Sequence, residues 1–405
     1  MANVLRWQKN LIGDLAVDIW NTHGNGNQMD AFANMELKLG YRNRGDKEED
    51  WKEYASTFQS RQMVCGADRE HLNNVHNCSM IPIFDLGTLH HDYYLLNIRI
   101  PSLYLSTKNV TGKVKENLGS NLDIWLLCNN QNGGFTMMYL SIKTIFFFLT
   151  FIQMIWFLRS LLKVGRKPQI LEVMLITVAS FLAILNLPVE YLTLVYNLPW
   201  IQLFEKSRET MFCANLFIFW LILFSENSVK QRSKLEYLKW IVSTLFISGL
   251  MIGFYTHETI LRLQNPFSSI WNTEIGTFIG VTFIKFLGLT ISLYFLFLCY
   301  TIWIFFKTCD TNPRLFNSKD NNRKLQLRMK VLMVLSLFAA AMTVIYLITI
   351  MVAEGAYKWD ENLQETLKNT SALIIGVYAM WNFYVNGLMY LYAPFNEDLC
   401  EQILD

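Results

Sequence analysis

TMMYLSIKTIFFFLTFIQMIWFL, residues 136–158, decides what kind of protein this chain is. The stretch carries a single charged side chain, Lys143. A helix that crosses a bilayer needs about 20 mostly apolar residues, so this segment is long enough to span a membrane. Six further stretches meet the same description. They are residues 170–194, 209–225, 238–260, 275–306, 328–353 and 369–393.

The composition divides the 405 residues between two environments. Charged residues make up 17% of the chain, against about 25% in an average soluble protein. The shortage lies in the apolar runs, whereas the N-terminal third reads like a soluble domain. The sequence therefore predicts a domain at 1–135, a seven-helix bundle at 136–393 and a short tail at 394–405. The net charge of +2 gives nucleic-acid binding no support.

Positively charged residues indicate which side of the membrane each loop faces. Fifteen Lys and Arg residues lie in or beside the loops after the first, third and fifth apolar runs, and five lie in the alternate loops. Cytoplasmic loops are rich in Lys and Arg, so the first set is predicted to be cytoplasmic. The N-terminal domain is then expected in the lumen or outside the cell. Glycosylation sequons at Asn77 and Asn109 agree with that placement, although residues 1–30 lack the apolar core of a signal peptide.

The N-terminal domain is predicted to be an antiparallel β-sandwich or partial barrel. Apolar and polar residues alternate along five stretches, as they do in half-buried strands, and turn-forming residues separate these stretches. The stretches are Leu15–Trp20, Ala33–Tyr41, Met80–Leu86, Tyr93–Ile100 and Leu122–Leu127.

Two cysteines of this domain, Cys65 and Cys78, enclose a short loop and could form a disulfide if the domain faces the lumen. Two free thiols, the alternative, fit only a cytosolic domain. No Cys-x-x-Cys pair occurs among the seven cysteines, which argues against a structural zinc site. His90 and His91 are neighbours in a strand-like stretch and would point to opposite faces, which disfavours a shared metal ion. We therefore expect no metal and no cofactor.

Ionisable and amide side chains inside the apolar runs are functional candidates, because burying them unpaired is expensive. Asn186 and Glu190 lie about one helical turn apart around Pro188, which should kink the second helix. Asn382 and Asn386 share one side of the last helix. Three roles stay open for such groups: hydrogen bonds between helices, a water-filled ion path, and the wall of a ligand cavity. The other candidates are Lys143, Glu172, Asn215 and Lys285.

Aromatic residues are dense in the loops that are predicted to be lumenal. An ordinary belt of aromatic side chains at the membrane interface accounts for most of them. The segment NPFSSIW at 265–271 is denser than such a belt requires and could be an ordered cap over the bundle.

Several segments of the chain resemble those of the Wntless family. They are YLLNIRIP at 94–101, QNGGFT at 131–136, NPFSSIWNTEIG at 265–276, LYFLFLC at 293–299, AAMTVI at 340–345 and GVYAMWNFYVNGLMYLYAP at 376–394. The resemblance runs in order from about Arg6 to Pro394. It implies a lumenal β-sandwich of the GOLD or lipocalin-like kind, followed by a receptor-like helix bundle.

The resemblance also implies a function. Wntless proteins are cargo receptors and not enzymes: they take newly acylated Wnt in the endoplasmic reticulum, escort it through the Golgi to the plasma membrane and return through endosomes. Expected partners are acylated Wnt proteins and membrane lipids, with retromer and coat adaptors during trafficking. Residues predicted to bind the lipid or Wnt are chosen by aromatic position and not by a family motif. They are Phe254, Tyr255, Phe267, Trp271, Tyr378 and Trp381.

The chain departs from the family pattern in two places. The family begins with a further membrane helix and more lumenal sequence, so we expect a truncated or short form here. Family members can carry a tyrosine-based endocytic signal in the third cytoplasmic loop, where this chain has Asn322–Leu325 without a tyrosine.

A signalling receptor of the G-protein-coupled type is the main alternative, since it shares the seven helices and the basic third loop. Against it, no Asp-Arg-Tyr follows the third run, and the last run ends in YLYAP at 390–394 and not in Asn-Pro-x-x-Tyr. An internal repeat would indicate a transporter, and paired acids or a Ser/His set would indicate an intramembrane enzyme. The sequence shows neither pattern.

Overall fold

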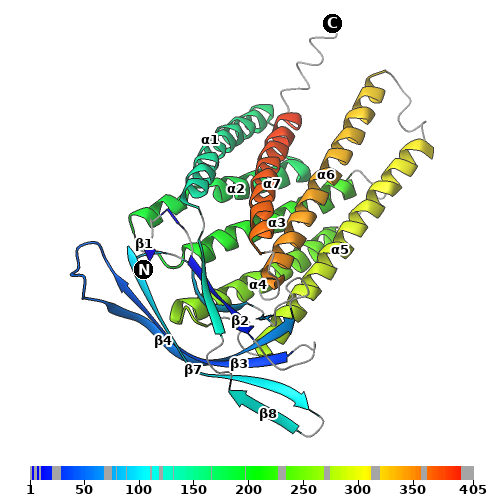
Figure 1. The fold of residues 1–405 in the computed structure, drawn as a ribbon. Helices are drawn as coiled ribbons and strands as arrows, with labels where there is room; N and C mark the ends of the chain where they lie inside the picture. Colours follow the sequence, from blue (N-terminus) through cyan, green and yellow to red (C-terminus); the bar gives the residue numbers. More distant parts are fainter. Residues whose placement is uncertain are drawn as a thin grey trace.

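The protein has a β domain at one end of a bundle of long helices (Figure 1). The chain passes through the strands first and then through the helices, and α7 ends far from the sheet. The computed structural model describes residues 2–3, 7–8, 11–20, 29–67, 75–78, 80–87, 89–109, 112–117, 122–130, 132–165, 167–196, 198–226, 234–268, 274–311, 320–356 and 363–393.

In the described part of the β domain, nine strands form one antiparallel sheet in the order β1-β7-β3-β4-β5-β2-β6, with β8 also paired to β7 and β9 to β2. The strands are β1 (Ala2–Asn3), β2 (Leu11–Trp20), β3 (Met29–Arg42), β4 (Lys52–Ala67), β5 (Val75–Cys78), β6 (Ile81–Leu86), β7 (Tyr93–Asn109), β8 (Gly112–Asn117) and β9 (Leu122–Asn130).

The sheet folds over itself to enclose an apolar core. Met35, Leu37 and Leu39 are buried at every second position of β3, as the period of a strand requires. They join Leu15 of β2 and Ile83 of β6 in one cluster, so strands from distant parts of the sheet face each other. This arrangement confirms the predicted β-sandwich.

Sequence analysis located five strands but missed β4, one of the longest. Its alternation is hidden because apolar and polar residues do not separate by face: Phe58 is exposed beside Ser56 and Ser60, whereas Gln59 and Arg61 point inward. The strand is defined instead by its backbone pairing with β3, which runs along nearly its whole length, from Cys65 to Lys52.

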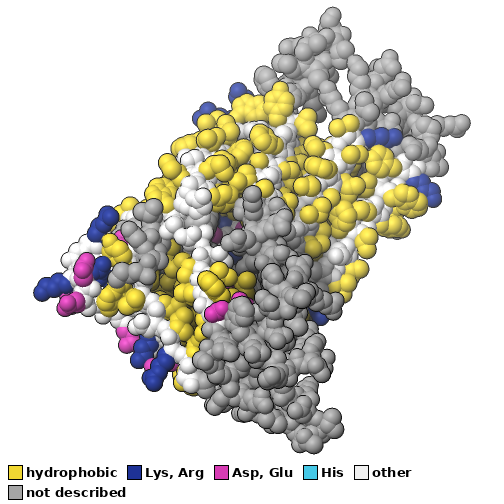
Figure 2. Space-filling view, in the orientation of Figure 1, with side chains coloured by type: hydrophobic (Ala, Val, Ile, Leu, Met, Phe, Trp, Pro, Cys, Tyr) yellow, Lys and Arg dark blue, Asp and Glu magenta, His cyan; other side chains and the backbone are white. Residues whose placement is uncertain are grey.

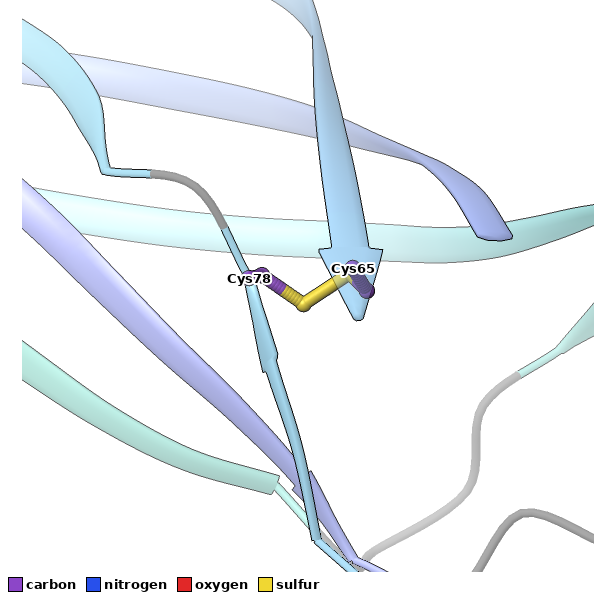
Figure 3. Close-up of a disulfide and its surroundings, with 2 residues drawn as sticks. All are labelled: Cys65 and Cys78. Atoms are coloured by element: carbon purple, nitrogen blue, oxygen red, sulfur yellow. A yellow bond between two sulfur atoms is a disulfide. The ribbon is translucent and has the colours of Figure 1, made fainter. Parts of the chain in front are cut away.

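The Cys65–Cys78 disulfide joins β4 to β5 where these strands pair (Figure 3). Both cysteines are buried in the sandwich core. The bridge ties the half of the sheet built on β3 and β4 to the half built on β2.

Seven helices in the described part of the chain are long and apolar enough to cross a membrane, as predicted. Hydrophobic side chains cover much of the visible helical surface, and many of the visible charged side chains lie toward the two ends of the molecule (Figure 2). The helices are α1 (Gly133–Val164), α2 (Ile170–Asn186), α3 (Ile201–Glu226), α4 (Lys234–Gln264), α5 (Glu274–Thr311), α6 (Asp320–Ala356) and α7 (Leu363–Leu391), and a 3-10 helix η1 (Val189–Leu194) follows α2.

The second predicted run is not a single kinked helix. The α-helix ends at Asn186, and the 3-10 helix begins at Val189. Pro188 has no N–H to continue the helix, and it disfavours the helical conformation of the residue before it. Leu187 is accordingly extended, with φ −61° and ψ 118°. The prediction of a kink was therefore wrong in form, because the proline separates two helices.

Replacing Cys65 and Cys78 together with Ser should lower the free energy of unfolding by about 3 kcal/mol, because the unfolded chain loses a cross-link. The two cysteines are 13 residues apart in the sequence. The melting temperature of the purified protein in detergent measures the effect. Cys128→Ser is the control, since Cys128 is free and exposed. An unchanged melting temperature in the double variant would contradict the prediction.

Candidate functional site

Three buried charges, Lys143 of α1, Glu190 of η1 and Arg208 of α3, meet in the half of the bundle nearer the β domain. We call them the polar centre. Lys143 Nζ donates to Glu190 Oε1 at 2.6 Å, and Arg208 Nη2 donates to the same oxygen at 2.8 Å. The side chains are only 4%, 1% and 3% exposed, so the ions depend on each other and not on water. A buried ion without a partner costs several kcal/mol.

Arg208 also satisfies the end of α2. Its Nη1 donates to the carbonyl oxygens of Ile184, at 3.1 Å, and Leu187, at 2.7 Å. The last carbonyls of a helix have no partner within the helix, and a cation beside them is favourable. The helix break at Pro188 thus creates a site that Arg208 fills.

A chain of amide and hydroxyl groups extends the polar centre toward α7. Asn186 Nδ2 donates to Asn382 Oδ1 at 2.6 Å, and the Tyr378 hydroxyl donates to Asn186 Oδ1. Asn186 and Asn386 both donate to Thr150 Oγ1 of α1, at 3.4 and 3.3 Å. Among the three roles left open by the sequence, these contacts are those of hydrogen bonds that hold α1, α2 and α7 together.

The remaining polar candidates lie elsewhere. Glu172 accepts from the backbone N–H of Gln169 at 2.7 Å and caps the start of α2. Asn215 donates to the Met211 carbonyl of its own helix at 2.8 Å. Lys285 is exposed on α5. The structure therefore brings five of the eight candidates together: Lys143, Asn186, Glu190, Asn382 and Asn386.

Arg208 was not among the residues predicted from the sequence, because it was expected to lie in a loop. The reason is that the third helix begins at Ile201 and not at residue 209, which places Arg208 inside the helix. The available signal was helical spacing: Arg208 lies four residues before Phe212, a fully buried residue of the same helix.

The six predicted lipid- or Wnt-binding residues do not share one place. Tyr378 and Trp381 lie in the main bundle core, where Trp381 Nε1 donates to Thr343 Oγ1 at 2.9 Å. Phe254 of α4 stacks on Phe283 of α5, with ring centroids 4.9 Å apart. Tyr255 lies beneath Lys206 Nζ, at 5.5 Å. Phe267 is buried in the β-sandwich, and Trp271 lies outside the described residues.

A smaller apolar cluster lies between α4, α5 and α6, beside the main core. Its buried members are Leu287, Ile291 and Val344. The side chains that pack around them are only partly buried: Ile247, Met251, Phe283, Ile284, Phe295 and Leu347. We call this set the α4–α6 cluster. The sequence could not single it out, because these helices are apolar along most of their length.

The β domain carries an acidic pair near the bundle, the buried Asp14 of β2 and the partly buried Asp85 of β6. Burial raises the pKa of Asp14 to about 6, and the nearby Asp85 carboxylate adds to this effect. Burial also raises the pKa of Asp85, while the Arg262 guanidinium, 2.7 Å away, opposes the rise. Protonation of Asp14 therefore becomes favourable at mildly acidic pH.

The raised pKa of Asp14 predicts a pH dependence with a definite sign. Its contribution to stability is fully present below the ordinary value of 3.8 and is lost as pH rises through about 6. Asp14→Asn, which keeps a neutral side chain, should raise the melting temperature at pH 7 and flatten its fall between pH 4 and pH 7. Asp50→Asn, on the exposed loop before β4, is the control. Equal pH profiles for the parent and Asp14→Asn would refute the prediction.

Glu190→Gln should destabilise the protein by about 3–5 kcal/mol, because Lys143 and Arg208 would lose the carboxylate between them. The melting temperature in detergent measures the loss. Arg159→Gln, which removes an exposed charge from the other end of α1, should have little effect. If the two variants melt alike, the polar centre is not a stabilising contact.

Comparisons with known proteins agree with this architecture. The family described as Wntless, GOLD domain, matches residues 1–131, and the Wntless-like transmembrane domain matches residues 132–396. The chain is also similar to the protein wntless of Drosophila mojavensis, with 36% identity over 406 residues, which cover 96% of this chain and 70% of that protein. Protein wntless of Drosophila ananassae is 37% identical over 408 residues, with the same coverage.

These matches extend over both parts of the molecule and follow the change from strands to helices. The boundary between the two matched regions, 131 and 132, falls directly before α1. The β domain is thus the GOLD domain of the matched family, and the bundle is its transmembrane domain. The chain belongs to the Wntless family of multi-pass membrane proteins.

Proposed function

We propose that this protein is a cargo receptor that binds lipid-modified Wnt proteins and carries them from the endoplasmic reticulum and Golgi to the cell surface. The family name ties it to Wnt secretion. The finer proposal rests on how the bundle could treat an acyl chain. It assigns the lipid to the helices and the protein part of Wnt to the β domain.

The observation that carries the proposal is the α4–α6 cluster. Exposing an acyl chain of about sixteen carbons to water costs roughly 0.8 kcal/mol of free energy for each CH₂, so a carrier has to cover the chain. The cluster offers apolar, partly buried side chains from three helices, and one of them, Phe283, stacks on the neighbouring ring of Phe254. Side chains that are only partly packed can accept a further apolar group without loss of a tight core.

The polar centre supports the assignment of the acyl chain to one side of the bundle. Its ion pairs and amide contacts join α1, α2, α3 and α7 into one firmly connected side of the bundle. On the other side of the bundle, α4 and α5 meet through aromatic rings, with Phe254 stacked on Phe283 and Trp240 edge to face with Phe297. We assign the acyl chain to this second side, where an apolar guest displaces no buried ion pair.

The proposed topology places the GOLD domain in the lumen and the basic loops in the cytoplasm, in accordance with the distribution of Lys and Arg. Retromer and coat adaptors would then meet the loops between α1 and α2, α3 and α4, and α5 and α6. The endoplasmic reticulum, Golgi, endosomes and plasma membrane are the proposed compartments. Coupling to G proteins, the earlier alternative, is not favoured by the family match.

A pull-down with purified Wnt tests the lipid-shielding proposal. Acylated Wnt should be captured from detergent solution, and a Wnt whose acylated serine is replaced by Ala should be captured far less. Capture of neither form would refute the cargo-receptor proposal. Equal capture of both would refute lipid shielding while leaving a protein–protein contact in place.

The double variant Phe254→Ala/Phe283→Ala should weaken the binding of acylated Wnt about thirtyfold, since each ring contributes roughly 1 kcal/mol of apolar contact. The matched control is Phe246→Ala/Phe286→Ala on the same two helices, whose side chains are 67% and 53% exposed. The control should keep parental capture. A loss of the same size in both pairs would show that the α4–α6 cluster is not the lipid site.

A further inference from the structure

The turn that follows α4, residues 265–268, is docked against the β domain. Phe267, which follows α4 by three residues, is 1% exposed and belongs to the core cluster of the sandwich. The backbone around it is also held, since the Asp85 N–H donates to the Pro266 carbonyl at 3.0 Å. Gln59 and Arg61 of β4 both donate to the Phe267 carbonyl at 3.4 Å. Side chain and backbone of this turn are therefore bound to the β domain.

The turn is also shaped from within. Asn265 Oδ1 accepts from the Phe267 N–H at 3.0 Å, and the Asn265 carbonyl accepts from the Ser268 N–H at 2.9 Å. These bonds fix where Phe267 leaves the end of α4. A displacement of the turn therefore displaces the helix end.

An ion pair adds a second attachment one turn earlier on α4. Arg262 Nη1 lies 2.7 Å from Asp85 Oδ2, and Arg262 also pairs with Glu258 on its own helix. The Arg262 and Asp85 side chains are 33% and 25% exposed, so the pair adds little to overall stability. Its geometric effect is larger, since it sets the direction of α4 relative to β6.

Within the bundle, α4 packs mainly against α3 and approaches α5 and α6 closely at few positions. Across residues 238–264 of α4, Ser248 is the one buried side chain, whereas α3 is buried along most of its length. The rings of Phe254 and Phe283 stack between α4 and α5 near the β domain, and Trp240 meets Phe297 edge to face farther along the two helices. The spacing of α4 and α5 at the end nearer the β domain therefore depends on the attachment of α4 to that domain.

We propose that Phe267, Arg262 and Asp85 are positioning residues through which the β domain sets the spacing of α4 and α5, and with it the access of an acyl chain to the α4–α6 cluster. The proposal rests on the cargo function proposed above. A cargo that contacts the β domain and inserts its lipid beside α4 engages two linked sites. Since such coupling is reciprocal, a weakened anchor weakens the cooperation between the two contacts.

The spacing can be measured without cargo. Nitroxide labels on Leu250→Cys and Leu289→Cys, both exposed on their helices, report the α4–α5 distance by pulsed electron paramagnetic resonance. The background carries Ala in place of Cys128, Cys213, Cys299, Cys309 and Cys400 and keeps the Cys65–Cys78 disulfide. Phe267→Ala/Arg262→Gln should broaden the distance distribution relative to this background.

Conservative and remote variants separate positioning from general damage. Phe267→Leu/Arg262→Lys keeps an apolar plug and a positive charge, so it should restore the narrow distribution. Lys38→Gln, which removes an exposed ion pair with Glu36 on β3, should leave it unchanged. An unchanged distribution in Phe267→Ala/Arg262→Gln, or equal broadening in the conservative variant, would overturn the proposal.

The capture of acylated Wnt is then measured with the same variants. Phe267→Ala/Arg262→Gln should lower capture of acylated Wnt severalfold, and the conservative variant should recover it. If the parent captures no Wnt, the proposed function fails while the distance measurement still judges the anchor. If the parent captures Wnt and the broadened variant captures it equally well, the anchor does not govern lipid access.

Discussion

The cost of leaving a buried charge unpaired in a membrane governs the bundle, and Glu190 Oε1 is the acceptor that two buried cations share. Pro188 ends α2, where the Ile184 and Leu187 carbonyls accept only short-range bonds, from the Leu187 N–H at 3.3 Å and the Val189 N–H at 2.8 Å. Arg208 donates to these carbonyls, but its charge then needs a carboxylate, which Glu190 supplies. Lys143 completes the set from α1. A break in one helix thus determines which side chains two other helices must present.

This constraint divides the bundle into two unequal sides. Around the polar centre, helices are joined by buried hydrogen bonds whose loss would leave ions or amides unpaired in an apolar environment. Around the α4–α6 cluster they meet through partly buried apolar side chains. Apolar contacts are not directional, so helices on this second side can shift with a smaller penalty. The β domain contributes the missing restraint, because Phe267 and Asp85 hold the end of α4.

The same physics explains which sequence predictions succeeded. The spans and the sandwich follow from local patterns of apolar residues, and the structure confirms both. Strand β4 escaped detection because Gln59 and Arg61 face inward, where Arg61 reaches the Phe267 carbonyl. An inward-facing Arg61 is explained only by its acceptor, the Phe267 carbonyl, which is 206 residues away in the sequence. Pro188 ends the helix and does not only kink it, and Arg208, from another helix, donates to the carbonyls of Ile184 and Leu187 at that end.

By itself, the sequence determined which segments lie in water and which in the bilayer. It also determined the number of membrane helices, the strand character of the first domain and the family. Each of these depends on composition or on short-range periodicity, which a chain carries wherever it folds. Only the tertiary structure decided that Lys143, Glu190 and Arg208 share one site and that Phe267 lies in the sandwich core. Those pairings join residues far apart in the chain, and burial makes them obligatory only after the helices and strands have packed.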